Sequence, residues 1–212
     1  MSDTLYLSLW YPNLRLATVA DKLVAVLDAF AAHGGSPLVY SATVWPVSWS
    51  ETPVFQQVYG RRAAPGPNTE GTTGVVPRLA VEEALERLHE DFAYEFQIGW
   101  NLWEADVSAG LDPHWSYEQR MVRVVGYGPL FDDGAYEAEG HIRIDLGSDA
   151  AFLEEDAELD SVGASHVAEN VVRLVALASA VEKASGATAR LLWSELGESL
   201  AQRLTARLGV RN

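Results

Sequence analysis

The stretch FAYEFQIGWNL, residues 92–102, decides the fold of this 212-residue chain. Large apolar side chains occupy every second position from Phe92 to Leu102, and the positions between them are small or polar. A period of two places alternate side chains on opposite faces of a strand. The stretch therefore predicts a central strand with one face in the core and the other face toward solvent.

Five elements are predicted before this strand. They are a strand from about Leu5 that ends at Tyr11, a helix capped by Thr18 and ended by Gly34, a strand over 38–47, a short strand over 54–59 and a helix over 78–91. The Gly-, Pro- and Thr-rich residues 61–74 are expected to form a mobile loop. With the central strand, the order is βαββαβ, which is the ferredoxin-like order.

The second half of the chain continues the alternation of strands and helices. An irregular segment over 105–117 is expected, then strands near 118–127 and 141–146, an acidic linker and a helix over 165–184. Ser194 caps a last helix, whose apolar seam is Leu196, Leu200, Leu204 and Leu208. Residues 188–193 fit either a last short strand or the start of that helix.

These elements predict a single α+β domain over residues 1–212. Its sheet is expected to be mixed but largely antiparallel, with six to seven strands and about four helices against it. No linker is rich enough in Pro, Gly or Ser to mark a domain boundary. Residues 1–104 and 118–212 could be degenerate halves of a duplication, although no repeat aligns.

Composition excludes several classes of protein. The chain has no cysteine, which removes disulfides, thiolate metal sites and thiol nucleophiles. No apolar run approaches the roughly 20 residues that span a bilayer, and the N-terminus has no basic segment typical of a secretory signal. A formal net charge of −15 disfavours binding to phosphate backbones. We therefore expect a cytoplasmic protein that binds neither membrane nor nucleic acid. Its oligomeric state stays open.

The negative charge is concentrated in one part of the chain. Residues 132–160 hold 11 of the 30 acidic residues and one basic residue, whereas residues 161–212 are mildly basic. Four acids of this part are candidate binding residues: Glu154, Glu155, Asp156 and Glu158. They could steer a basic partner, form a solvated linker, or pair with the C-terminal arginines.

Motifs for catalysis and for cofactors are incomplete. Gly126-Tyr-Gly128 begins like a dinucleotide-binding fingerprint but has no third glycine. Glu86-x-x-His89 is half of a di-metal motif that needs a second copy inside a four-helix bundle. No G-x-S-x-G or G-x-x-x-x-G-K-[ST] sequence occurs. The sequence thus predicts no catalytic residue, no metal and no cofactor.

Tryptophan forms the most distinctive pattern. Four predicted strands end in Trp, and acidic residues follow soon after several tryptophans. The candidate binding residues are Trp10, Trp45, Trp49, Trp100, Trp103, Trp193, Glu104 and Glu195. If the first helix joins two parallel neighbouring strands, Trp10 and Trp45 lie at the same end of the sheet. The rings could plug the ends of the sheet, anchor a protein partner, or line a small-molecule pocket.

The layout resembles a known family. A strand ending in Trp, an amphipathic helix, the central segment Ile98-Gly-Trp-Asn-Leu-Trp103 and a later hairpin resemble small α+β immunity proteins of bacterial polymorphic toxin systems. The resemblance implies a non-enzymatic protein that binds and blocks a toxin domain, often a basic nuclease. An acidic surface suits such a partner because opposite charge speeds encounter.

A second hypothesis remains beside it. The chain could be a hydrolase or a carbohydrate- or small-molecule-binding domain with a pocket bordered by Trp. Glu104 and Glu195 are then the candidate carboxylates. Two such groups divide acid and base roles when they lie roughly 5 to 9 Å apart.

Overall fold

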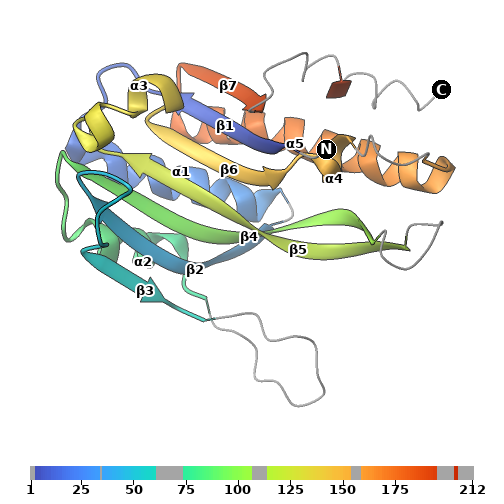
Figure 1. Ribbon diagram of the computed structural model, residues 1–212, viewed down its shortest axis with the longest axis horizontal. Helices are drawn as coiled ribbons and strands as arrows, with labels where there is room; N and C mark the ends of the chain where they lie inside the picture. Colours follow the sequence, from blue (N-terminus) through green and yellow to red (C-terminus); the bar gives the residue numbers. More distant parts are fainter. Residues whose placement is uncertain are drawn as a thin grey trace.

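A computed structural model describes residues 3–33, 35–60, 74–106, 114–153, 159–194 and 203–204. One sheet dominates it, with the long helices on one face (Figure 1). The strands are β1 (Thr4–Trp10), β2 (Gly35–Pro46), β3 (Phe55–Val58), β4 (Phe92–Asp106), β5 (His114–Tyr127), β6 (Ile142–Ser148) and β7 (Ala189–Ser194). The helices are α1 (Val19–Ala32), α2 (Pro77–Leu85), α3 (Tyr136–Glu139), α4 (Ala150–Leu153) and α5 (Ser161–Ser185), with 3₁₀ turns η1 (Leu16–Thr18) and η2 (Phe131–Asp133). The predicted α+β class is confirmed.

The sheet has seven strands in the order β3-β2-β4-β5-β6-β1-β7, and every neighbouring pair is antiparallel. The strand number agrees with the prediction, but the expected parallel component is absent from these pairs. The ferredoxin-like arrangement is not confirmed, because β1 pairs with β6 and β7 and not with β2, β3 or β4. β1 and β2 run in the same direction with three strands between them, so the condition that they are parallel neighbours is not met.

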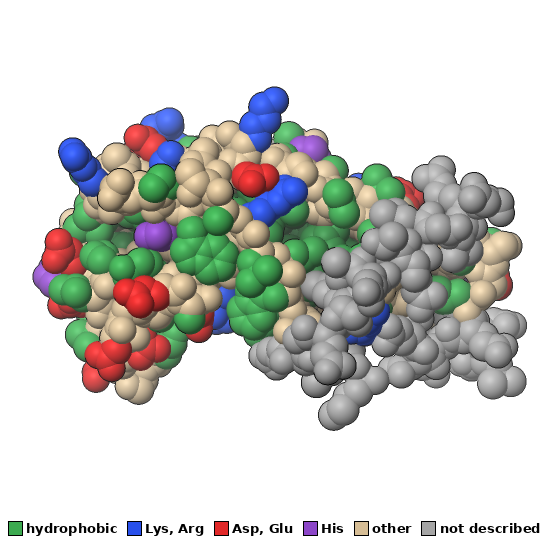
Figure 2. Space-filling model, turned by 90° about the horizontal axis from the view of Figure 1, so that it is seen from above, with side chains coloured by type: hydrophobic (Ala, Val, Ile, Leu, Met, Phe, Trp, Pro, Cys, Tyr) green, Lys and Arg blue, Asp and Glu red, His purple; other side chains and the backbone are tan. Residues whose placement is uncertain are grey.

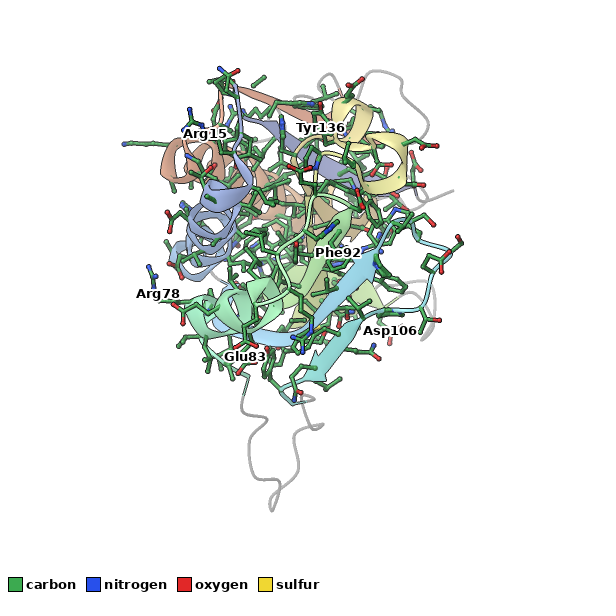
Figure 3. The ribbon with its side chains drawn as sticks, turned by 90° about the vertical axis from the view of Figure 1, so that its left-hand side faces the viewer. Arg15, Arg78, Glu83, Phe92, Asp106 and Tyr136 are labelled. Atoms are coloured by element: carbon green, nitrogen blue, oxygen red, sulfur yellow. The ribbon has the colours of Figure 1, made fainter. Side chains whose placement is uncertain are left out.

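The alternation predicted for β4 is confirmed. Tyr94, Phe96, Ile98, Trp100 and Leu102 are all fully buried on the face toward the helices. They pack against the apolar stripes of α1 and α5, which include Leu23, Leu27, Phe30, Val171, Leu174 and Val181. Burying each Leu, Val or Phe side chain contributes about 1.5–3 kcal/mol. Figure 3 views the molecule from the end near Phe92 and shows α1 and α2 on one side of the sheet and α3 on the other.

Several element boundaries differ from the predictions. β4 and β5 extend into the segment expected to be irregular, because their ladder continues to the pair Asp106↔His114. α2 ends at Leu85, so Leu88 is exposed rather than inward. Residues 189–194 are strand β7, which settles the alternative left open for that segment.

The helix ends and short helices also differ in detail. Thr18 occupies the N-cap of α1 as predicted, but its hydroxyl donates to the carbonyl of Arg15 instead of capping the helix. The described part contains five α-helices rather than about four, because it includes the short helices α3 and α4, which were not predicted. Residues 61–73 and 154–158 and most of the predicted C-terminal helix lie outside the described residues. No described helix is long and apolar enough to cross a membrane.

Asn170 fastens α5 to the sheet. Its side chain is fully buried, and its Oδ1 accepts a hydrogen bond from the Trp103 backbone N–H at 3.0 Å. Its Nδ2 donates to the carbonyls of Trp103 and Ala151, each at 2.8 Å. One amide therefore joins α5, β4 and α4 through three hydrogen bonds, of which the one to Ala151 is buried.

We predict that Asn170→Leu lowers the free energy of unfolding by about 2–4 kcal/mol, because it removes the partners of three main-chain groups at a buried junction. Equilibrium denaturation in urea measures the loss. Val172→Ala is the control on the exposed side of the same helix, and it should change the stability by less than about 0.5 kcal/mol. Equal stability of Asn170→Leu and wild type would show that this junction is dispensable.

Candidate functional site

The face of the sheet opposite α1, α2 and α5 carries mainly polar and aromatic side chains, and we call it the open face. Strand register places two rows of these side chains side by side. One row is Gln56, Thr43, Glu95, Val125, Arg143 and Ser8, and the next is Ser41, Gln97, Arg123, Asp145, Tyr6 and Trp193. The two rows cross most strands of the sheet, so side chains that are distant in sequence lie on one surface.

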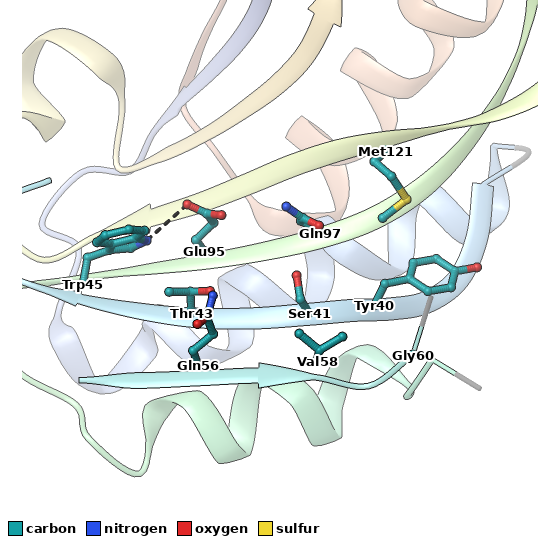
Figure 4. A pocket seen from close by; sticks show the side chains of 10 residues that line it. All are labelled: Tyr40, Ser41, Thr43, Trp45, Gln56, Val58, Gly60, Glu95, Gln97 and Met121. Carbon is teal, nitrogen blue, oxygen red and sulfur yellow. Dashed lines mark hydrogen bonds between the residues drawn. The ribbon is translucent and has the colours of Figure 1, made fainter. Parts of the chain in front are cut away.

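A groove of about 440 Å³ lies on the open face over β2, β3, β4 and β5 (Figure 4). We call it the open-face groove. Its lining residues are Tyr40, Ser41, Thr43, Trp45, Gln56, Val58, Gly60, Glu95, Gln97 and Met121. Trp45 lies at one end and Tyr40 and Met121 lie at the other. The lining has amide and hydroxyl groups, one carboxylate and no Lys or Arg, so it favours a ligand that donates hydrogen bonds or carries positive charge.

Among the described residues that line the groove, Glu95 is the only carboxylate, and its contacts fix its position. Its Oε2 accepts a hydrogen bond from Trp45 Nε1 at 3.2 Å and lies 3.7 Å from Arg123 Nη1. Arg123 also donates to Asp145 Oδ2 at 2.9 Å. Two carboxylates thus share one guanidinium, and the group keeps a net negative charge beside the groove. Only 12% of the Glu95 side chain is exposed, which strengthens its attraction for a cation that enters.

Aromatic rings close the Trp45 end of the groove. Trp49 lies edge to face with Trp45, at 5.6 Å between ring centroids, and with Phe131, at 5.1 Å. The Trp49 ring also meets Tyr127 at 6.1 Å, and the Arg123 guanidinium lies 5.8 Å from the Trp49 centroid. Edge-to-face pairs contribute about 0.5–1.5 kcal/mol each beyond their buried area. These contacts hold both tryptophans in fixed orientations.

Three loops meet beyond these rings, over residues 47–54, 86–91 and 128–135, and we call this region the loop end. Backbone hydrogen bonds join them: Val47 N donates to Asp91 O at 2.8 Å, Asp132 N to Val47 O at 2.7 Å, and Leu130 N to Glu90 O at 2.9 Å. Val47 has a φ of 60°, which is rare for a β-branched residue and costs about 1–3 kcal/mol. The surrounding bonds therefore hold a strained turn in place.

The loop end combines apolar and acidic side chains. Val47 and Leu130 are 56% and 58% exposed. The three loops carry six acids and one arginine: Glu51, Glu86, Glu90, Asp91, Asp132, Asp133 and Arg87. Figure 2 shows acidic and hydrophobic side chains next to one another at its left end, where η2 and α3 lie. The loop end therefore presents two exposed apolar side chains together with an excess of acids.

A partly buried ion pair holds α3 against the open face. Arg143 Nη1 and the Tyr127 hydroxyl both donate to Glu139 Oε2. Arg143 is only 8% exposed, and its guanidinium lies 5.3 Å from the Tyr6 ring and 5.8 Å from the Tyr127 ring. Burial raises the pKa of Tyr127, so its hydroxyl remains a donor at neutral pH.

The tryptophans predicted as binding residues lie in different parts of the structure. Trp10 and Trp45 lie at one end of the sheet, and Trp10 Nε1 donates to the Glu137 carbonyl at 3.3 Å. Trp100 is fully buried in the core, where its Nε1 donates to the His33 carbonyl. It therefore offers no surface to a ligand in this structure.

Trp49 lies beside Trp45, whereas Trp103, Trp193 and Glu104 lie toward the other end of the sheet. Trp103 stacks on His166 at 3.8 Å, and Trp193 stacks on Tyr6 at 4.5 Å. Glu104 Oε1 lies 3.6 Å from Arg120 Nε, well away from the open-face groove. Five predicted site residues lie outside the described residues: Glu154, Glu155, Asp156, Glu158 and Glu195. Of the proposed pairs between the acidic segment and the C-terminal arginines, the structure shows Asp149 with Arg203 at 3.6 Å.

Sequence reasoning missed most of the groove. Gln97 and Met121 come together with Gln56 only through the pairing of β3, β2, β4 and β5. The sequence of β4 did contain a signal. Its large apolar side chains occupy every second position, and Glu95 and Gln97 occupy positions between them, which face the opposite side of the strand. That pattern identifies the face but not its partners.

Neither a metal site nor a relative identifies the function. The described residues contain no group of three or more His, Asp or Glu side chains that could hold a metal ion. Comparison with protein-family models, with curated proteins and with solved structures finds no match to this chain. The site is therefore interpreted from its own chemistry.

We predict that Glu139→Ala lowers the free energy of unfolding by about 2–4 kcal/mol, because it leaves the Arg143 guanidinium buried without its carboxylate. Thermal and urea denaturation measure the loss. Glu137→Ala removes an exposed carboxylate from the same short helix and should cost less than about 0.5 kcal/mol. A similar small cost for both variants would mean that the Arg143–Glu139 pair does not hold α3.

Proposed function

We propose that this chain is a non-enzymatic binding protein of the immunity type, which binds a basic protein partner through the open-face groove and the loop end. The observation that carries the proposal is the chemistry of this continuous surface. The groove has one carboxylate and no base, and the loops beside it have six acids and one arginine. Trp45 links the two parts, since it lines the groove and contacts Trp49.

The surface has the composition of a protein interface. Exposed Val47 and Leu130 supply an apolar centre, and acids around them supply a polar border. Trp and Tyr are frequent among residues that dominate binding energy. A Lys or Arg side chain of the partner would lie over the Trp45 ring and donate to Glu95. The hydrogen bonds between the loops reduce the entropy lost on binding.

The proposal includes a cytoplasmic location and a protein ligand. Nucleic acid is disfavoured as the ligand, because a net charge of −15 repels phosphates. The same charge accelerates encounter with a basic protein, and salt weakens this acceleration.

A small-molecule or carbohydrate ligand is the second candidate. The groove volume of about 440 Å³ lies within the range of small-molecule sites. Trp45 offers a face for stacking, and Gln56, Gln97 and Glu95 offer hydrogen bonds. The hydrolytic form of this hypothesis used Glu104, which lies outside the groove, together with Glu195, which lies outside the described residues.

We predict that the chain binds the basic C-terminal domain of a toxin encoded next to its gene and restores growth of bacteria that express this domain. Gln97→Arg combined with Leu130→Arg places positive charge in the groove and on the loop end, and should weaken the purified complex at least tenfold. Val175→Arg and Val172→Arg together add the same charge to exposed positions of α5 and should leave binding unchanged. Surface plasmon resonance at two salt concentrations measures both rates.

Two results would contradict the proposal. One is the absence of a complex and of growth rescue. The other is equal binding by the open-face and α5 double variants. Binding of neutral oligosaccharides by wild type, with loss in Trp45→Ala, would favour the small-molecule candidate instead.

A further inference from the structure

A second pocket of about 360 Å³ lies at the end of the sheet where β1 and β5 end. Four rings line it: Tyr11, Tyr127, Tyr136 and His141. We call it the Tyr136 pocket. Figure 3 shows Tyr136 on α3 at the same upper end of the molecule as the loop that carries Arg15. Tyr11 and Tyr127 are buried, whereas Tyr136 and His141 are partly exposed, so the rings lead from the surface inward.

Pro129 and the segment after β1 supply the rest of the lining. Leu14, Leu16 and Val19 contribute aliphatic side chains. The polar contribution of this segment is Asn13, which is exposed at the border of the pocket. The pocket therefore combines aromatic and aliphatic surface with uncharged polar groups in comparable amounts.

The lining contains no Asp, Glu, Lys or Arg side chain. The ammonium group of Lys22 lies 5.4 Å from the Tyr11 ring, but it donates to the Ser185 carbonyl at 2.7 Å. Burial lowers the pKa of His141, so its ring is neutral at pH 7. A charged ligand would lose its hydration here without gaining a counter-ion. The chemistry of this pocket thus differs from that of the open-face groove, which contains Glu95.

His141 offers one hydrogen bond in a fixed direction. Its Nδ1 accepts from the Tyr11 backbone N–H at 3.2 Å, which places the proton of the neutral ring on Nε2. The ring also packs against Tyr136 at 4.7 Å between centroids. Among the described residues, no side chain or main-chain group bonds to Nε2. A donor is therefore held in place beside an aromatic surface.

We infer that the Tyr136 pocket binds an uncharged planar molecule of one or two fused aromatic rings that carries a hydrogen-bond acceptor. Its ring packs against Tyr136 and the buried tyrosines, and its acceptor accepts a hydrogen bond from the N–H at His141 Nε2. A volume of about 360 Å³ accommodates a molecule of this size. This inference concerns a separate pocket and does not depend on the proposed protein partner.

Three related probes test the inference on the full chain. Quinoline is planar and has a ring nitrogen as acceptor, N-methylquinolinium carries a positive charge, and quinoline-2-carboxylate carries a negative charge. Titrations followed by ¹H–¹⁵N spectra should show quinoline binding with a dissociation constant of about 1 mM or lower. The shifted amides should include those of Asn13, Leu16 and Tyr136. Both charged analogues should bind at least tenfold more weakly.

Matched variants locate the probe. Tyr136→Phe keeps the ring and should bind quinoline like wild type, whereas Tyr136→Ala should bind at least fivefold more weakly. Tyr40→Ala alters the open-face groove and should have no effect. Shifts confined to other regions, equal binding of the charged probes, or full binding by Tyr136→Ala would overturn the inference. If Tyr136→Ala does not fold, the relative affinities of wild type for the three probes still test the inference.

Discussion

The register of β4 is the constraint on which the structure depends. Its alternate positions place five fully buried side chains, from Tyr94 to Leu102, against the helices, and place Glu95 and Gln97 in the open-face groove. β5 pairs with β4 along nearly its whole length, β2 pairs with residues 92–100 of β4, and both strands inherit this division. A slip by one residue would bury the polar set and expose the apolar set. The core and the groove are therefore two consequences of one alternation.

Local sequence patterns predicted the individual strands and helices. The period of two in β4 and the apolar stripes of α1 and α5 were sufficient to predict these elements, because each pattern reflects one buried face. These local patterns could not predict the strand order. The order depends on pairing between segments distant in sequence, which places β5 and β6 between β4 and β1. The tryptophan pattern failed to separate roles for the same reason. Trp100 faces the core and Trp45 faces the groove, although both belong to short motifs that end in Trp.

Two sites of different chemistry share one aromatic support. Tyr127 lines the Tyr136 pocket, and its ring also meets Trp49 at the end of the open-face groove. Its hydroxyl and the Arg143 guanidinium both donate to Glu139, which fixes α3 between the two sites. The groove has a carboxylate for a cation, whereas the pocket has only uncharged groups. The pairing with Glu139 explains why the polar side chain of Arg143 is buried on the open face, away from the main core.

Selection from a random peptide library tests most directly whether the open face is a surface for basic partners. Peptides enriched on the immobilised chain should carry net positive charge and should lose at least tenfold in affinity for Gln97→Arg, while they bind Val175→Arg like wild type. Enrichment of neutral or acidic peptides, or equal affinity for both variants, would contradict this assignment of the open face.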